Sequence, residues 1–134
     1  MSTVIGVSLK AYFGRAETLA WAERVAELAS KPAITDGSVD LFVIPSFPEL
    51  ADVARILDGT PIRLGAQDVF WEDRGPYTGE VTADQLAELG VSIVEIGHAE
   101  RRRLFHETDE HPISRSAECE HGAYSHWVAP RNGP

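Results

Sequence analysis

Short apolar runs alternate with amphipathic segments along most of the chain. Four runs rich in β-branched residues predict strands at residues 3–9, 40–45, 62–68 and 91–97. Three segments between them repeat their apolar positions with the helical period, which predicts helices at residues 18–30, 50–57 and 83–89. Thr82 and Gln85 have the spacing of a capping box at the start of the third helix.

Strict alternation of strands and helices is typical of an α/β protein with right-handed crossovers and a parallel sheet. Both doubly wound sheets and β/α barrels fit this pattern. The glycine-rich G-x-G-x-x-G motif does not follow the first strand, which weakens the dinucleotide-binding version. Four units are enough for half of a barrel, because a complete (β/α)8 barrel needs about 250 residues.

The pattern changes after Glu110. Residues 111–134 show neither a helical stripe nor an alternation, so we predict a domain over residues 1–110 followed by an irregular, disordered tail. Cys119, His121 and His126 are zinc-ligand types, with Glu118, Glu120 or His111 available as a fourth, but their spacing matches no familiar site. We therefore expect no metal and no cofactor.

Composition narrows the range of partners. The 134 residues carry a formal net charge of −9, which argues against nucleic acids and anionic membranes. No apolar run approaches the roughly 20 residues that span a bilayer, and the N-terminus does not resemble a signal peptide. A single cysteine fits a reducing compartment. These features together predict a soluble cytoplasmic protein.

Polar side chains lie at or just beyond the carboxyl ends of three of the four predicted strands. Because the carboxyl ends of parallel strands form one rim, these side chains should converge there. A lysine at that rim offers a positive charge to an anion, and a histidine at a helix N-terminus should stay neutral and donate a hydrogen bond to a carbonyl. The residues concerned are Ser8, Lys10, Gln67, Asp68, His98 and Glu100.

Each of these residues also has a simpler interpretation. Lys10 alone fits a solvated surface lysine, and His98 alone fits a residue that merely begins a helix. Arginines 101–103 fit a solvated helical turn. Glu95, inside the fourth strand, is expected to point outward with its charge reaching solvent between helices.

Taken together, the motifs resemble the triosephosphate isomerase family. The segments that carry the resemblance, between about residues 4 and 110, are "GVSLK", "LFVIPSFPEL", "GAQDVFWEDRGPYTGEVT" and "VEIGHAERRRLFHE". The resemblance implies a (β/α)8 TIM barrel, of which this chain holds the first four units. It also implies a homodimer of glycolysis and gluconeogenesis that interconverts dihydroxyacetone phosphate and glyceraldehyde 3-phosphate through an enediol.

The resemblance also implies roles for individual residues. Lys10 would bind substrate electrostatically, His98 would be the electrophile that polarises the carbonyl, and Glu100 would order Lys10. Arg101 and Glu107 would form a structural ion pair. The remaining assignments are Ser8 as a substrate contact, Gln67 as a support at the third strand end, and Thr78 at the dimer interface within loop 68–80.

Three positions depart from the family pattern. Ser8 stands in place of the usual asparagine, Ala99 in place of a serine and His106 in place of a glycine. The "VEIGHAER" segment is closer to the related isomerases that act on erythrulose phosphate in polyol catabolism. A four-carbon ketose phosphate is therefore an alternative substrate for the same proton transfer.

The family's general base is a glutamate after the sixth strand, and nothing in these 134 residues resembles that segment or the phosphate-gripping loops. General-base catalysis contributes roughly 10²–10⁴-fold, so we expect negligible turnover from this polypeptide. A frameshift near residue 110 would account for the tail. In the remaining alternative, the half-barrel is non-catalytic and self-associates through open edges of its first and fourth strands.

Overall fold

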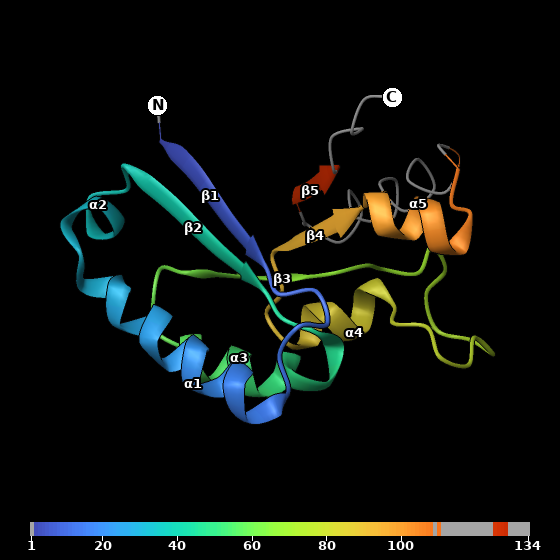
Figure 1. Cartoon of the computed structure of the whole chain (residues 1–134), viewed down its shortest axis with the longest axis horizontal. Helices are drawn as coiled ribbons and strands as arrows, with labels where there is room; N and C mark the ends of the chain where they lie inside the picture. Colours follow the sequence, from blue (N-terminus) through green and yellow to red (C-terminus); the bar gives the residue numbers. More distant parts are fainter. Residues whose placement is uncertain (1, 109, 111–124, 129–134) are drawn as a thin grey trace.

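The computed structural model describes residues 2–108, 110 and 125–128. Its sheet has five parallel strands in the order in which they occur along the chain. The sheet is curled (Figure 1). The strands are β1 (Thr3–Ser8), β2 (Val39–Ile44), β3 (Arg63–Ala66), β4 (Ile93–Ile96) and β5 (Ser125–Val128).

The helices that connect the strands follow the predicted periodicity. In Figure 1, α1, α3 and α4 lie together on one side of the sheet. Thr82 begins α4 as its N-cap, and its backbone N–H donates to Gln85 Oε1 at 3.0 Å, as the capping box predicts. The helical elements are α1 (Arg15–Ala26), η1 (Glu27–Ser30), α2 (Pro32–Thr35), η2 (Phe47–Glu49), α3 (Leu50–Leu57), α4 (Ala83–Glu88) and α5 (Ala99–Phe105).

Strand β5 is a difference from the sequence prediction, which placed no strand in residues 111–134. The structure pairs it with β4, with Ile93 opposite Ser125 and Ile96 opposite Val128. A parallel ladder is held by backbone groups, so four residues can extend a sheet without an apolar period of their own. Strand β4 is therefore not an open edge. Residues 111–124 and 129–134 lie outside the described part of the chain.

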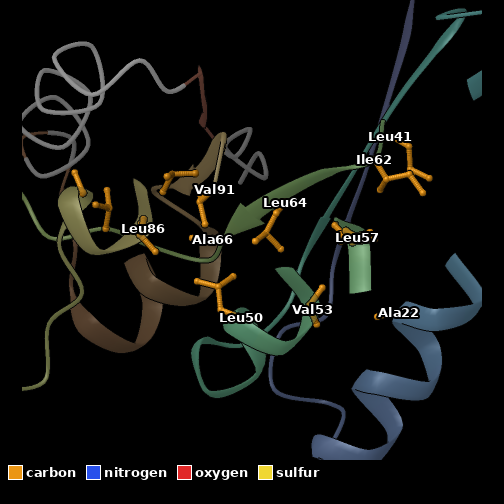
Figure 2. Close-up of a cluster of buried hydrophobic side chains, with 14 of the residues drawn as sticks. Ala22, Leu41, Leu50, Val53, Leu57, Ile62, Leu64, Ala66, Leu86 and Val91 are labelled. Atoms are coloured by element: carbon orange, nitrogen blue, oxygen red, sulfur yellow. The ribbon is translucent and has the colours of Figure 1, made fainter. Parts of the chain in front are cut away.

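The main hydrophobic core fills the space between the sheet and the helices. Alternate residues of β2, β3 and β4 point into it, such as Leu41 of β2 and Leu64 of β3, and they meet the apolar faces of α1, α3 and α4 (Figure 2). Helix α3 contributes Leu50, Val53 and Leu57, the stripe that its periodicity predicted. The core thus holds the strands at fixed positions and fixes where their carboxyl ends lie.

A second, smaller cluster lies on the opposite, inner face of the sheet. Phe42, Ile44 and Ile93 form it. Gly6 of β1 faces Phe42 so closely that a Cβ at position 6 would come within 2.1 Å of the ring. The absence of that side chain leaves room for the Phe42 ring beside β1.

Candidate active site

The carboxyl ends of β1, β3 and β4 converge on one pocket of about 530 Å³. The sequence predicted this rim, and the parallel topology brings it together. Apolar side chains, including Tyr12, Phe47 and Phe105, line the same pocket. The predicted polar residues that line it are Ser8, Lys10, Gln67, Asp68, His98 and Glu100.

Lys10 lies just beyond the end of β1 in a left-handed backbone conformation, with φ of 52°. Its carbonyl oxygen accepts a hydrogen bond from the Gln67 side-chain amide at 2.8 Å. The end of β3 thereby fixes the backbone that follows β1 in a conformation that non-glycine residues seldom adopt. The Lys10 side chain, 30% exposed, reaches the centre of the polar cluster.

His98 connects β4 to α5 and is the N-cap of that helix. Its Nδ1 accepts a hydrogen bond from the backbone N–H of Glu100 at 3.2 Å. The Glu100 carboxylate also lies against Nδ1, but that side chain is 46% exposed and screened by water. A neutral His98 ring that accepts this backbone N–H at Nδ1 carries its proton on Nε2, which lies beside Glu95 and Lys10 in the pocket.

The environment of His98 lowers its pKa from the ordinary value of 6.5. Burial is the main cause, because it penalises the charged imidazolium. Glu95 acts in the opposite direction and Lys10 lowers the pKa further. The ring is therefore neutral at neutral pH, with an Nε2–H available as a donor.

Glu95 does not point outward between the helices, so that expectation was wrong. Val94 and Ile96 on either side of it belong to the core beneath the helices, which directs Glu95 to the inner face of the sheet. Its side chain is 3% exposed and lines the pocket. The period-two alternation of β4 was the signal in the sequence that could have placed it.

The Glu95 carboxylate contacts three of the other pocket residues. Ser8 Oγ donates to Oε2 at 2.8 Å. Lys10 Nζ lies 3.3 Å from Oε1. His98 Nε2 lies 3.1 Å from the same Oε1. The nearest carboxylate to Lys10 is therefore Glu95, whereas the predicted partner Glu100 lies 4.0 Å away.

Arg101 lines the pocket and anchors the start of α5. Its Nε lies 2.6 Å from Glu107 Oε1, so the ion pair implied by the resemblance is present. The same Nε lies 2.7 Å from Asp68 Oδ2, a contact that the sequence did not predict. Both carboxylates are buried. This guanidinium ties the loop after β3 to the helix that carries His98.

Thr78 lies on the surface, in the long loop between β3 and α4, and does not line the pocket. The loop is closed by a hydrogen bond from Phe70 N–H to the Val81 carbonyl at 2.8 Å. The rings of Phe70 and Tyr77 pack inside it with centroids 4.7 Å apart. Thr78 is exposed in the single chain, and its place at a dimer interface stays a prediction.

The described residues contain no group of three or more histidine, cysteine, aspartate or glutamate side chains that could hold a metal ion. Cys119 and His121, two of the zinc ligands considered above, lie outside them, and the side chain of His126 is likewise not described. No helix in the described part of the chain is long and apolar enough to cross a membrane.

Comparison with known proteins agrees with this geometry. The profile of the family described as triosephosphate isomerase matches residues 3–123. An L-erythrulose-1-phosphate isomerase of Pectobacterium atrosepticum is 51% identical over 114 residues, which cover 84% of this chain and 44% of that protein. A triosephosphate isomerase of Caldanaerobacter subterraneus is 52% identical over 79 residues, which cover 59% of this chain and 32% of that protein.

A third relative, an L-erythrulose-1-phosphate isomerase of Mycolicibacterium smegmatis, is 46% identical over 108 residues, or 79% of this chain and 40% of that protein. The chain thus spans less than half the length of these curated relatives. The profile match extends past residue 110, where the sequence pattern alone had placed the end of the resemblance. On the profile and the strand-end cluster together, the chain belongs to the triosephosphate isomerase family.

Proposed function

We propose that this chain supplies the electrophilic side of an aldose–ketose isomerase site for a short sugar phosphate. One observation carries the proposal: a neutral His98 presents Nε2–H into the same pocket as the Lys10 ammonium group. A hydrogen-bond donor and a fixed cation at one point suit a reaction in which negative charge develops on a carbonyl oxygen.

The proposed reaction moves a proton between neighbouring carbons. A base removes the proton from the carbon next to the carbonyl, the C–H electrons form a C=C bond, and the carbonyl oxygen becomes an enediolate oxygen. His98 Nε2–H donates to that oxygen, and Lys10 offsets its charge. The proton of the neighbouring hydroxyl group passes by way of His98 to the former carbonyl oxygen, so that the neighbouring oxygen becomes the new carbonyl. Return of the abstracted proton to the former carbonyl carbon then completes the exchange of aldose and ketose.

The general base is the part that the 134 residues do not provide in recognisable form. The three carboxylates in the pocket, Asp68, Glu95 and Glu100, contact the arginine, lysine or histidine side chains around them. The resemblance assigns the base to a glutamate after a sixth strand. We therefore propose that this polypeptide alone has negligible turnover and that its site is completed by the second half of a barrel.

Two substrates fit the same chemistry. Dihydroxyacetone phosphate and glyceraldehyde 3-phosphate are the three-carbon pair, and an erythrulose phosphate is the four-carbon candidate. The similar proteins carry both names. Ser8 lies in the pocket at a position where the family has an asparagine. This difference is a reason to retain the four-carbon sugar phosphate as a candidate substrate. We further propose a cytoplasmic homodimer, in keeping with the metabolic relatives and the single cysteine.

Activity is best tested in two chimeras. Residues 1–110 would be joined to the matching C-terminal part of the Pectobacterium protein in one and of the Caldanaerobacter protein in the other. Coupled assays would measure kcat/KM on both substrates, with the 134-residue chain assayed beside them. We expect both chimeras to turn over, and His98→Asn to lower kcat by about 10²–10³-fold because one donor to the oxyanion is lost.

The ratio of kcat/KM for the two substrates tells which half sets specificity. A ratio common to both chimeras belongs to residues 1–110, and a ratio that changes with the attached half belongs to that half. Folded chimeras without activity on either substrate would overturn the proposed function. Turnover by the 134-residue chain that His98→Asn abolishes would contradict the assignment of the base to the missing half.

A further inference from the structure

We propose that Glu95 is a positioning residue, whose buried carboxylate holds Lys10 and His98 together and keeps His98 Nε2–H as the donor. The inference rests on the proposed function for its meaning, since it concerns the same pocket. The role of Glu95 itself is inferred from its contacts in the structure, because neither the resemblance nor the comparisons assign it one.

Glu95 is buried in β4 and reaches across the inner face of the sheet. Glu95 lies in the middle of β4, where every residue of the strand is buried. Strands β1 and β4 are not neighbours, because β2 and β3 lie between them in the sheet. Glu95 nevertheless reaches Ser8 and Lys10 across the inner face. The carboxylate therefore bridges the two strand ends that carry the electrophile and the cation.

The two carboxylate oxygens of Glu95 contact different partners. Oε2 accepts the Ser8 hydroxyl hydrogen, which orients the group. Oε1 faces both Lys10 Nζ at 3.3 Å and His98 Nε2 at 3.1 Å. Lys10 Nζ and His98 Nε2 are themselves in contact. The Lys10 ammonium group can only donate, and Oε1 lies beside both nitrogens as an acceptor for Lys10 and for a His98 ring protonated on Nε2.

The negative charge of Glu95 is buried beside His98. A carboxylate that is 3% exposed must be compensated by donors, and Ser8, Lys10 and His98 supply them. The charged groups that face the His98 ring are Glu95 from β4, Lys10 from beyond β1 and Glu100 from α5. Glu95 is the most deeply buried of the three, so solvent screens its effect on His98 least.

A nuclear magnetic resonance titration of the His98 ring in the 134-residue chain tests the inference. The resonance is assigned by its loss in His98→Asn. In Glu95→Gln the side chain keeps its size but loses its charge, so we expect the His98 titration midpoint to move to lower pH. Lys10→Met removes the opposing cation, so we expect the midpoint to move to higher pH.

Glu88→Gln is the matched control, because it makes the same substitution on α4 at a side chain that is 71% exposed and paired with Arg74. An unchanged His98 midpoint in Glu95→Gln, in a variant whose amide spectrum is otherwise native, would overturn the proposal. A midpoint that also moved in Glu88→Gln would overturn it, because the effect would then not depend on contact.

A measurement on the unmutated chain covers the case in which Glu95→Gln does not fold. Nitrogen-15 shifts above the titration midpoint should show Nε2 protonated, with an Nε2–H that exchanges slowly because Glu95 accepts it. An Nδ1–H tautomer, or an Nε2–H that exchanges as fast as in an exposed histidine, would contradict the inference. None of these readouts needs turnover, so they stand apart from failure of the proposed isomerase activity.

Discussion

A histidine that burial keeps neutral makes the stability of this chain depend on pH. The folded pKa of His98 lies below its ordinary value of 6.5, which applies to the unfolded chain. Between those two values the unfolded state binds more protons than the folded state. The contribution of His98 to the free energy of unfolding is therefore complete above pH 6.5 and is lost as pH falls through the folded pKa.

Urea unfolding at about pH 7.5 and about pH 5.5 measures this dependence. We expect His98→Asn to lose less stability than the wild-type chain between the two conditions, and asparagine preserves the N-cap. His106→Asn, at an exposed left-handed position that asparagine tolerates, controls for replacing a histidine. An equal loss of stability in His98→Asn and wild type would rule out His98 as the source.

The placement of single residues could be predicted from the sequence where a strand end fixed it. Lys10 and His98 each follow an apolar run directly, and parallel strands must bring such positions to one rim. The orientation of Glu95 was predicted wrongly because its charge was given more weight than the period-two alternation of its strand. Ser8, one partner of the buried Glu95 carboxylate, is 87 residues away in the sequence, and the curl of the sheet brings the two together.

At the scale of elements, one arginine connects α5 to the loop after β3. Arg101 is a partner of two buried carboxylates, Asp68 and Glu107, so its removal takes one close cation away from both. We predict that Arg101→Gln lowers the free energy of unfolding by about 2–4 kcal/mol, somewhat below a fully buried pair because Arg101 is 31% exposed. Urea unfolding of the purified variants measures the change.

The control for this prediction is Arg103→Gln, the same substitution at an exposed residue of the same helix. Arg101→Lys should fall between the two, because a lysine keeps the charge but lacks the guanidinium fork. A loss in Arg101→Gln no larger than that in Arg103→Gln would show that the carboxylates find other donors.

Most elements were predictable because their patterns are local. The apolar stripe of α3 and the capping box of α4 are read within a few residues, and both are present. Helix α2 and strand β5 were missed for a physical reason. A four-residue helix has too few positions to show a helical period. A short strand at the edge of a sheet is held by backbone hydrogen bonds, which do not require a particular side-chain pattern in the sequence.

At the scale of the whole molecule, helices cover one face of the curled sheet, and β1 and β5 are its two edges among the described strands. Among the described strands, β1 pairs with β2 alone, and its residues from Thr3 to Gly6 are exposed. Val4 is 60% exposed on this strand. Unpaired backbone groups beside apolar side chains are a template for pairing with another chain.

We therefore predict that the isolated chain self-associates through β1. Light scattering after size exclusion should give an average mass above the 14.7 kDa of one chain, rising with concentration. Val4→Lys should lower that mass, because a charge on an edge strand opposes strand pairing. Leu104→Lys, at a residue of α5 that is 59% exposed, controls for the loss of an apolar side chain elsewhere.

The two substitutions separate three forms of association. If Val4→Lys alone lowers the mass, the edge of β1 is the contact. Equal effects of both would indicate general adhesion of exposed apolar surface and would contradict an edge contact. A dimer that neither variant weakens would instead direct attention to the exposed loop that carries Thr78, where Thr78→Arg should then dissociate it. A monomer at every concentration would show that the open edge of β1 is protected in solution.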